Sequence, residues 1–175
     1  MPKSRPLSMR SSQPCAVSIR PMMAADRPAV AGIVTSIENF NAAEMDCALE
    51  LVDVYLQSGS RADYRFAVAE DSGAAVKAYA CWGPTPLTLG TYDLYWLPTQ
   101  PDSRGAGFGR ALMAYVESSV RREKGRLLVV ETSSKESYGN TVRFYRNLGY
   151  EETSRIRDFY DVGDDKLILV KRLSR

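Results

Sequence analysis

A glycine-rich turn between a predicted strand and a predicted amphipathic helix constrains this chain more than any other feature. The turn carries Gly105, Gly107 and Gly109 at alternate positions, with Arg104 before them and Arg110 after them. Glycine adopts positive φ at little steric cost and lets a ligand approach backbone N–H groups closely. Those N–H groups, the positive end of the helix dipole and the two guanidinium groups all favour an anion. The sequence therefore predicts a phosphate site, and more specifically a pyrophosphate site, at this turn.

Two familiar phosphate-binding motifs do not match this turn. A dinucleotide-binding fingerprint needs G-x-G-x-x-G in a tight strand-to-helix turn, whereas these glycines are spaced G-x-G-x-G after a longer loop at residues 100–103. A P-loop needs Lys and then Ser or Thr after its last glycine, and neither follows Gly109. A plain flexible loop is the remaining structural alternative, and it is disfavoured because each glycine costs folding entropy.

Composition excludes several classes of site and partner. With 175 residues, 45% of them hydrophobic, the chain is long enough for one domain with a substantial core. It has no histidine, which removes His-based catalytic bases and His metal ligands, and we predict no metal site. The net charge of +2 is too weak by itself to argue for a nucleic-acid or membrane partner, and no apolar run reaches the roughly 18–20 residues of a membrane span. Three widely spaced cysteines without a C-x-x-C pair indicate a reducing compartment, so we expect a cytoplasmic protein.

The chain reads as one domain, residues 16–175, preceded by an extension. Residues 1–15 combine basic residues with prolines and serines, and we expect them to be poorly ordered. Apolar alternation or short apolar runs predict strands at 16–20, 64–70, 76–82, 92–99, 126–132, 150–160 and 166–173. Apolar stripes at helical spacing predict helices at 26–37, 45–59, 108–120 and 140–148. We expect Asp26 to cap the first helix, with Pro28 in its first turn.

Two motifs together resemble the GNAT superfamily of acetyl-CoA-dependent N-acetyltransferases. The glycine turn follows the pattern Arg/Gln-x-x-Gly-x-Gly, and residues 92–102 before it are similar to the family's fourth strand. The segment Asn140-Thr-Val-Arg-Phe-Tyr-Arg-Asn-Leu-Gly-Tyr resembles the family's second coenzyme A motif. Residues 158–167 are similar to a closing hairpin of small acetyltransferases. The resemblance covers roughly residues 17–173.

The resemblance implies an α/β (α+β) fold of the acyl-CoA N-acyltransferase type. A central, twisted, mixed but mostly antiparallel sheet of about 6–7 strands would be flanked by four helices and splayed between strands 4 and 5. The implied reaction is direct attack of a primary amine, of a small molecule or a protein, on acetyl-CoA without an acyl-enzyme. Homodimers are common in the families that the chain resembles.

Coenzyme A contacts are also implied by the resemblance, position by position. Backbone amides of the turn 104–110 would hold the pyrophosphate. Main-chain groups of Leu97 and Thr99, on either side of Pro98, would pair with the pantetheine arm as an added strand does. Asn140 matches the asparagine that contacts this arm. The predicted cofactor-binding residues are Leu97, Pro98, Thr99, Arg104, Gly105, Ala106, Gly107, Phe108, Gly109, Arg110 and Asn140.

Three residues are candidates for proton transfer. Tyr145 matches the tyrosine that lies near the thioester sulfur, where it would protonate the leaving thiolate. Asp93 is the favoured base, because alternation places it on one strand face with Tyr95 and Leu97. Glu131, at the end of the buried fifth strand, is the second candidate. For both carboxylates the structural alternative is an ordinary surface charge.

No motif in the sequence identifies the acceptor. Glu44 and the aromatic residues Trp82, Tyr95 and Trp96 are candidates to border its pocket, although such residues more often serve as helix-surface charges and core. Two other functions stay open. One is a non-catalytic acetyl-CoA-binding or sensing domain, since fold does not fix function. The other is a toxin-like acetyltransferase that acts on aminoacyl-tRNA, for which we would expect a stronger basic patch.

Overall fold

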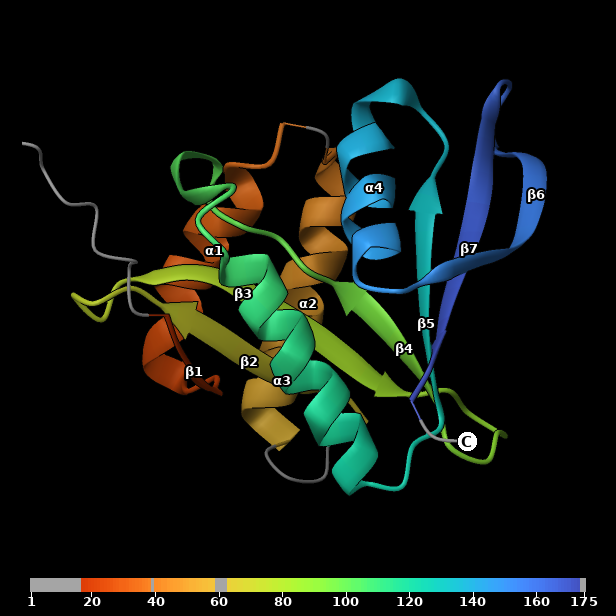
Figure 1. The fold of residues 1–175 in the computed structure, drawn as a ribbon. Helices are drawn as coiled ribbons and strands as arrows, with labels where there is room; N and C mark the ends of the chain where they lie inside the picture. The colour runs from red at the N-terminus through yellow and green to blue at the C-terminus, as the bar shows by residue number, and fades with distance from the viewer. Residues whose placement is uncertain (1–16, 39, 59–62, 174–175) are drawn as a thin grey trace, which may run out of the picture.

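A seven-stranded sheet lies between two pairs of helices in the computed structural model of this protein (Figure 1). The structure describes residues 17–38, 40–58 and 63–173, so the predicted extension at residues 1–15 and the predicted helix stop at Gly59 lie outside the described residues. In chain order the elements are β1 (Ser18–Pro21), η1 (Ala24–Asp26), α1 (Arg27–Thr35), α2 (Ala42–Ser58), β2 (Arg65–Glu70), β3 (Val76–Pro84), β4 (Thr91–Trp96), η3 (Pro101–Ser103), α3 (Phe108–Arg122), β5 (Leu127–Ser133), η4 (Glu136–Tyr138), α4 (Gly139–Asn147), β6 (Glu151–Asp161) and β7 (Asp164–Arg172).

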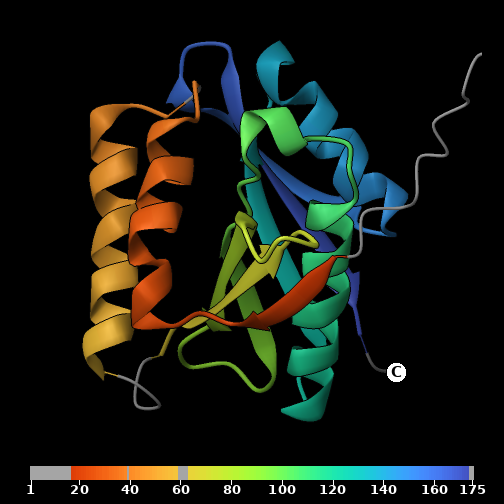
Figure 2. The ribbon, with the colours of Figure 1, turned by 90° about the vertical axis from the view of Figure 1, so that its left-hand side faces the viewer.

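The sheet has the order β1-β2-β3-β4-β5-β7-β6 and is antiparallel except at one pair. β4 and β5 run parallel, and their crossover connection is α3. Helices α1 and α2 cover one face, and α3 and α4 cover the other, so the molecule has three layers (Figure 2). The predicted fold class, a mixed and mostly antiparallel sheet flanked by four helices, is therefore confirmed.

Side-chain size on the two faces of β2 and β3 explains how the helices pack. Toward α3 these strands present small residues, among them Ala67 and Ala78, which let the helix lie close to the sheet. Toward α1 and α2 they present larger ones, among them Phe66 and Tyr79. Alternation along each strand thus separates two clusters of buried side chains, one on each side of the sheet.

A β-bulge in β4 changes the alternation on which one prediction depended. Trp82 of β3 pairs with Leu94 and Cys81 pairs with Trp96, so Tyr95 is the extra residue. Past the bulge, Leu97 packs into the cluster beneath α3, whereas Tyr95 lies beside Gly83 on the α1/α2 side. The prediction that Leu97 shares a face with Asp93 and Tyr95 is therefore wrong.

The sheet opens at the same point. The parallel pairing of β4 with β5 runs from Thr91 opposite Leu127 to Leu94 opposite Val130 and goes no further. β5 continues to Ser133, held by β7 instead. In Figure 1 the two strands diverge toward their arrowheads, which is the predicted splay between strands 4 and 5.

The first helix begins differently from the prediction. Asp26 closes the short η1 turn, and its carboxylate makes no capping hydrogen bond to α1. It accepts two hydrogen bonds from the Arg20 guanidinium, at 2.7 and 2.8 Å, and one from the Met23 N–H. The guanidinium holds the pKa of Asp26 below its usual range. Pro28 lies in the first turn of α1, as predicted.

Candidate active site

The glycine turn leaves the first N–H groups of α3 without side-chain partners. Gly105 and Gly107 have φ values of 79° and 95°, in the left-handed region that other residues avoid. Gly107 is the N-cap residue of α3 and no side chain caps the helix. An uncapped helix start leaves N–H donors free and carries the positive end of the helix dipole. A Cβ at Gly105 or Gly107 would meet nothing within 4 Å, so the space in front of the turn is open.

Two arginines add positive charge around these donors. Arg104 and Arg110 are both exposed. Among the residues that the structure describes, no carboxylate lies within 4.0 Å of either guanidinium. Guanidinium groups bind phosphate oxygens in a bidentate manner. The turn therefore has the donors, the charge and the room for a diphosphate.

The chain between β4 and the turn presents free main-chain groups toward the opening. The Tyr79 N–H donates to the Pro98 carbonyl at 3.2 Å, and the Gln100 N–H donates to the Lys77 carbonyl at 2.8 Å. Because main-chain polar groups alternate in direction along an extended chain, those of Leu97 and Thr99 point away from β3. That direction is the side on which β5 has diverged. An extended ligand arm could hydrogen-bond there as a strand would.

α4 lies directly beside the start of α3. A Cβ on Gly109 would lie 3.4 Å from Cζ of Phe144 and 3.8 Å from Oγ1 of Thr99, so the ends of β4, α3 and α4 meet around this glycine. Asn140, in the first turn of α4, is exposed. Tyr145 on the same helix is buried, and its ring packs 5.6 Å from that of Tyr150. Burial raises the pKa of Tyr145, so its hydroxyl stays protonated at neutral pH.

Asp93 is placed on the α1/α2 side of the sheet, opposite Gly83 of β3. It accepts a hydrogen bond from the Thr85 hydroxyl at 2.7 Å. Burial, with the Asp93 charge as the second cause, raises the pKa of Tyr95 to about 12. Leu97 lies four positions beyond Asp93, a span of about 13 Å along a strand. Asp93 pairs with Val129 inside the joined part of β4 and β5, whereas Leu97 lies beyond the last pair.

Glu131 lies one residue beyond the last β4–β5 pair, at the mouth of the opening. Its side chain is 48% exposed and forms an ion pair with Nζ of Lys166 at 2.7 Å. That ammonium group also lies 3.8 Å from the centre of the Phe159 ring. Glu44 has a structural task instead: it exchanges hydrogen bonds with Asn41 in a capping box that begins α2.

The structure brings together Gly109 of the turn, Thr99 and Phe144 of α4, and it places the two candidate bases on different strands, β4 and β5. Sequence analysis did not find Thr85, Lys166 or Phe144 as neighbours of these groups. Their partners come from other strands and helices, and only the register of the sheet and the helix packing bring them close. Phe144 and Lys166 lay inside motifs that the sequence had already marked, whereas Thr85 did not.

Two kinds of feature are absent from the described residues. No group of three or more His, Cys, Asp or Glu side chains there is arranged to hold a metal ion. No helix in the described part of the chain has both the length and the apolar character needed to cross a membrane.

Known families and structures were compared with this chain. The model of the acetyltransferase (GNAT) domain matches residues 62–152. A protein of the GNAT family from Desulfovibrio desulfuricans is 42% identical and covers 91% of this chain and 100% of its own, with a TM-score of 0.85. No curated protein matches the chain.

Two more distant structures share the fold. The yncA protein of Salmonella typhimurium, solved with its cofactor acetyl-CoA, is 21% identical over 91% of this chain and 95% of its own, with a TM-score of 0.70. The ribosomal-protein-S18-alanine N-acetyltransferase of Escherichia coli is 19% identical over 91% of this chain and 96% of its own, with a TM-score of 0.71.

Proposed function

Because this chain belongs to the GNAT acetyltransferase family, we propose that it transfers the acetyl group of acetyl-CoA to a primary amine of a small molecule or protein. The observation that carries the proposal is the meeting of three elements at Gly109: the uncapped start of α3, the free edge beyond β4, and α4. The reducing cytoplasm is the compartment that we propose for this reaction.

The residues that would hold acetyl-CoA fit its chemistry. When bound, acetyl-CoA supplies an activated thioester. N–H groups of the turn 104–110 would bind the pyrophosphate, with Arg104 and Arg110 beside it. Main-chain groups of Leu97 and Thr99 would bind the pantetheine arm, and Asn140 would contact it. The N–H of Leu97 would polarise the thioester oxygen, a contribution that needs no proton transfer.

Proton movement decides which side chains take part. An alkylamine with a pKa of about 10.4 costs about 4.6 kcal/mol to deprotonate at pH 7. We propose Asp93 or Glu131 as the group that accepts this proton, directly or through water. Tyr145 would donate its hydroxyl proton to the leaving sulfur, and its raised pKa keeps that proton in place before the reaction. The thiol of coenzyme A has a pKa of about 8.5, so its thiolate can leave without being protonated. Tyr145 would therefore increase the rate without being essential to the reaction.

Mixing the purified protein with acetyl-CoA and a panel of amines, and following free thiol with a chromogenic reagent, tests the proposal. We expect turnover with at least one polyamine, amino acid, aminoglycoside or peptide amine. Calorimetric binding of coenzyme A without turnover on any amine would favour the non-catalytic sensing domain. No heat with coenzyme A would refute both functions.

Substitution of Tyr145 by Phe tests the proton donor. We expect kcat to fall by a factor within the range of about 10²–10⁴ that general acids contribute, with coenzyme A affinity nearly unchanged. Full activity in the variant would remove the hydroxyl from the chemistry.

Asp93→Asn and Glu131→Gln separate the two candidate bases. Loss of the true base should slow an alkylamine acceptor by at least about 10²-fold, and should slow an aromatic amine, already neutral at pH 7, far less. Glu136→Gln is the control, because Glu136 is exposed in η4. Equal slowing of both acceptors would mean that the carboxylate has another role.

A further inference from the structure

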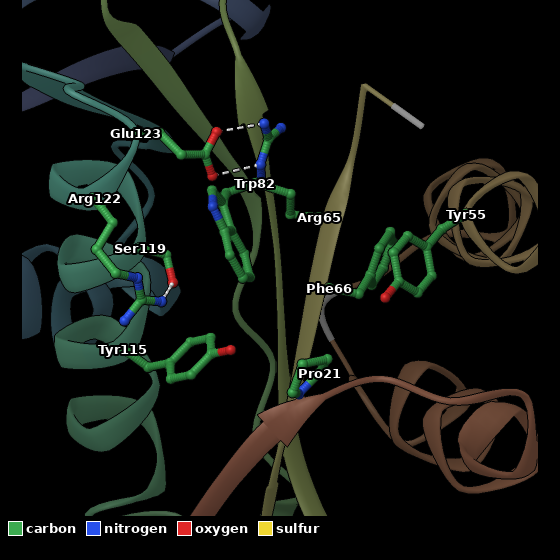
Figure 3. A pocket seen from close by; sticks show the side chains of 9 residues that line it. All are labelled: Pro21, Tyr55, Arg65, Phe66, Trp82, Tyr115, Ser119, Arg122 and Glu123. Atoms are coloured by element: carbon green, nitrogen blue, oxygen red, sulfur yellow. Dashed lines mark hydrogen bonds and ion pairs between the residues drawn. The ribbon is translucent and has the colours of Figure 1, made fainter. Parts of the chain in front are cut away.

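A cavity of about 270 Å³ lies at the far end of α3 from the glycine turn. Its walls come from the C-terminal half of α3, from β2 and β3, and from the opposite side at Pro21 and α2 (Figure 3). Tyr115 and Ser119 line it from α3, about 12 and 18 Å along the helix from Gly107. The cavity is therefore separate from the site proposed for acetyl-CoA, and nothing in the proposed reaction uses it.

Two aromatic pairs form the sides of this cavity. Trp82 and Tyr115 pack edge to face with their ring centres 6.2 Å apart. Across the cavity, Phe66 and Tyr55 pack with their ring centres 5.0 Å apart. In Figure 3 Tyr115 projects from α3 toward Phe66 and Pro21, and Trp82 closes the back. Aromatic side chains on two sides of a cavity favour contact with a flat apolar ring.

A buried donor at the back of the cavity has no partner. Trp82 is 3% exposed, and its Nε1–H makes no hydrogen bond to any residue in the described part of the chain. A buried donor left unpaired destabilises the fold, because it has lost its hydrogen bonds to water. The nitrogen end of the indole lies toward the Arg65–Glu123 pair in Figure 3.

The charges around the cavity favour an anion. Arg65 is matched by Glu123, since its Nε donates to that carboxylate at 2.8 Å. Arg122 donates to the Ser119 hydroxyl at 2.8 Å, and no carboxylate of a described residue lies within 4.0 Å of its guanidinium. One positive charge at the rim is thus left without a counter-charge, and guanidinium binds a carboxylate through paired hydrogen bonds.

We propose that this cavity binds a small planar aromatic acid, with its ring between Tyr115 and Phe66 and its carboxylate on Arg122. The volume is just below the about 300–1,000 Å³ typical of sites for small molecules, which limits the ring system to one or two fused rings. The site is separate from the one proposed for coenzyme A.

NMR with 2-naphthoate as the probe tests the proposal on the full chain. The chain has two tryptophans, so a ¹⁵N-labelled sample gives two indole N–H signals, and Trp96→Phe assigns the signal of Trp82. With coenzyme A present in excess, 2-naphthoate should shift the Trp82 signal in a saturable way. The neutral analogue 2-naphthalenemethanol should bind at least about tenfold more weakly, a difference of about 1.4 kcal/mol.

Two arginine variants then identify the anion contact. Arg122→Gln should weaken 2-naphthoate at least tenfold and leave 2-naphthalenemethanol unchanged, and Arg122→Lys should restore part of the loss. Arg157→Gln, in the exposed strand β6, is the control and should bind 2-naphthoate normally. The proposal is overturned if the signal does not shift, if coenzyme A displaces the probe, if the neutral analogue binds equally well, or if Arg122→Gln has no effect.

Discussion

Gly107 offers a test of the anion site in which charge is separated from backbone strain. Its φ of 95° lies in the left-handed region, and any side chain there is strained by about 1–2 kcal/mol. Asn and Asp tolerate this region better than other residues and have the same shape. Gly107→Asn and Gly107→Asp should therefore lose similar stability, and they differ by one negative charge in front of the α3 N-terminus.

The magnitude of that difference follows from the geometry. A Cβ at Gly107 meets no protein atom within 4 Å, so the new carboxylate points into the space where the pyrophosphate would lie. Two like charges 4 Å apart repel by about 1 kcal/mol in water and about 4 kcal/mol at an effective dielectric of 20. Since the turn is exposed, an intermediate value of about 1.4–3 kcal/mol is reasonable. Coenzyme A should bind about 10- to 150-fold more weakly to the Asp variant than to the Asn variant.

Calorimetric titration of coenzyme A into both variants, at low and at high salt, measures this difference. Thermal unfolding of the two proteins checks that their stabilities match. Added salt should reduce the difference in coenzyme A affinity between the two variants, because salt screens exposed charges. Equal affinities, or a gap that salt leaves unchanged, would refute the placement of the pyrophosphate at this turn.

Two predictions concern stability and are measured by urea unfolding. Gly125→Ala should lower the free energy of unfolding by about 3 kcal/mol, because its Cβ would lie 2.8 Å from Cε2 of Tyr92. Gly32→Ala lies inside α1, where a Cβ would meet nothing within 4 Å, and it should raise the free energy of unfolding by about 0.5–1 kcal/mol. Equal effects of the two would contradict the packing. Arg20→Gln should lower the free energy of unfolding by about 2–3 kcal/mol at pH 7. This is less than the loss expected on breaking a fully buried ion pair, because the Arg20 side chain is 27% exposed. The pKa of Asp26 is lowered in the folded state, so its ionised carboxylate stabilises the fold above the unfolded pKa of about 3.9. This stabilisation is lost as pH falls through the folded pKa. The variant should therefore lose less stability than the natural chain between pH 7 and pH 2.

The order of strands and helices was predictable because it rests on local signals. The apolar stripe of α3 and the glycines before it are written within one stretch of chain, and the structure places that helix at Phe108–Arg122. The four consecutive apolar residues 127–130 likewise indicated a strand, which the structure places at Leu127–Ser133. Each of these signals needs no knowledge of distant residues.

The parts that sequence analysis missed depend on partners far along the chain. Asp26 looked like a helix cap, but Arg20 on β1 takes its carboxylate, and local pattern does not reveal that competition. Nothing in the sequence of residues 121–124 indicates a partner on another strand. In the structure Glu123 binds Arg65 of β2 and Arg122 lines the aromatic cavity.

The bulge at Tyr95 connects these observations to the proposed chemistry. One inserted residue reverses the alternation of β4, so that Asp93 and Leu97 face opposite sides of the sheet. The parallel partner is lost at Leu94, and the free main-chain groups of Leu97 and Thr99 then line the opening without a β5 partner. A side chain on β4 before the bulge is therefore poorly placed to reach an amine held near Leu97. Glu131, which lies on the diverging strand at the mouth of the opening, is better placed, and we expect its substitution to slow alkylamine acceptors more than that of Asp93.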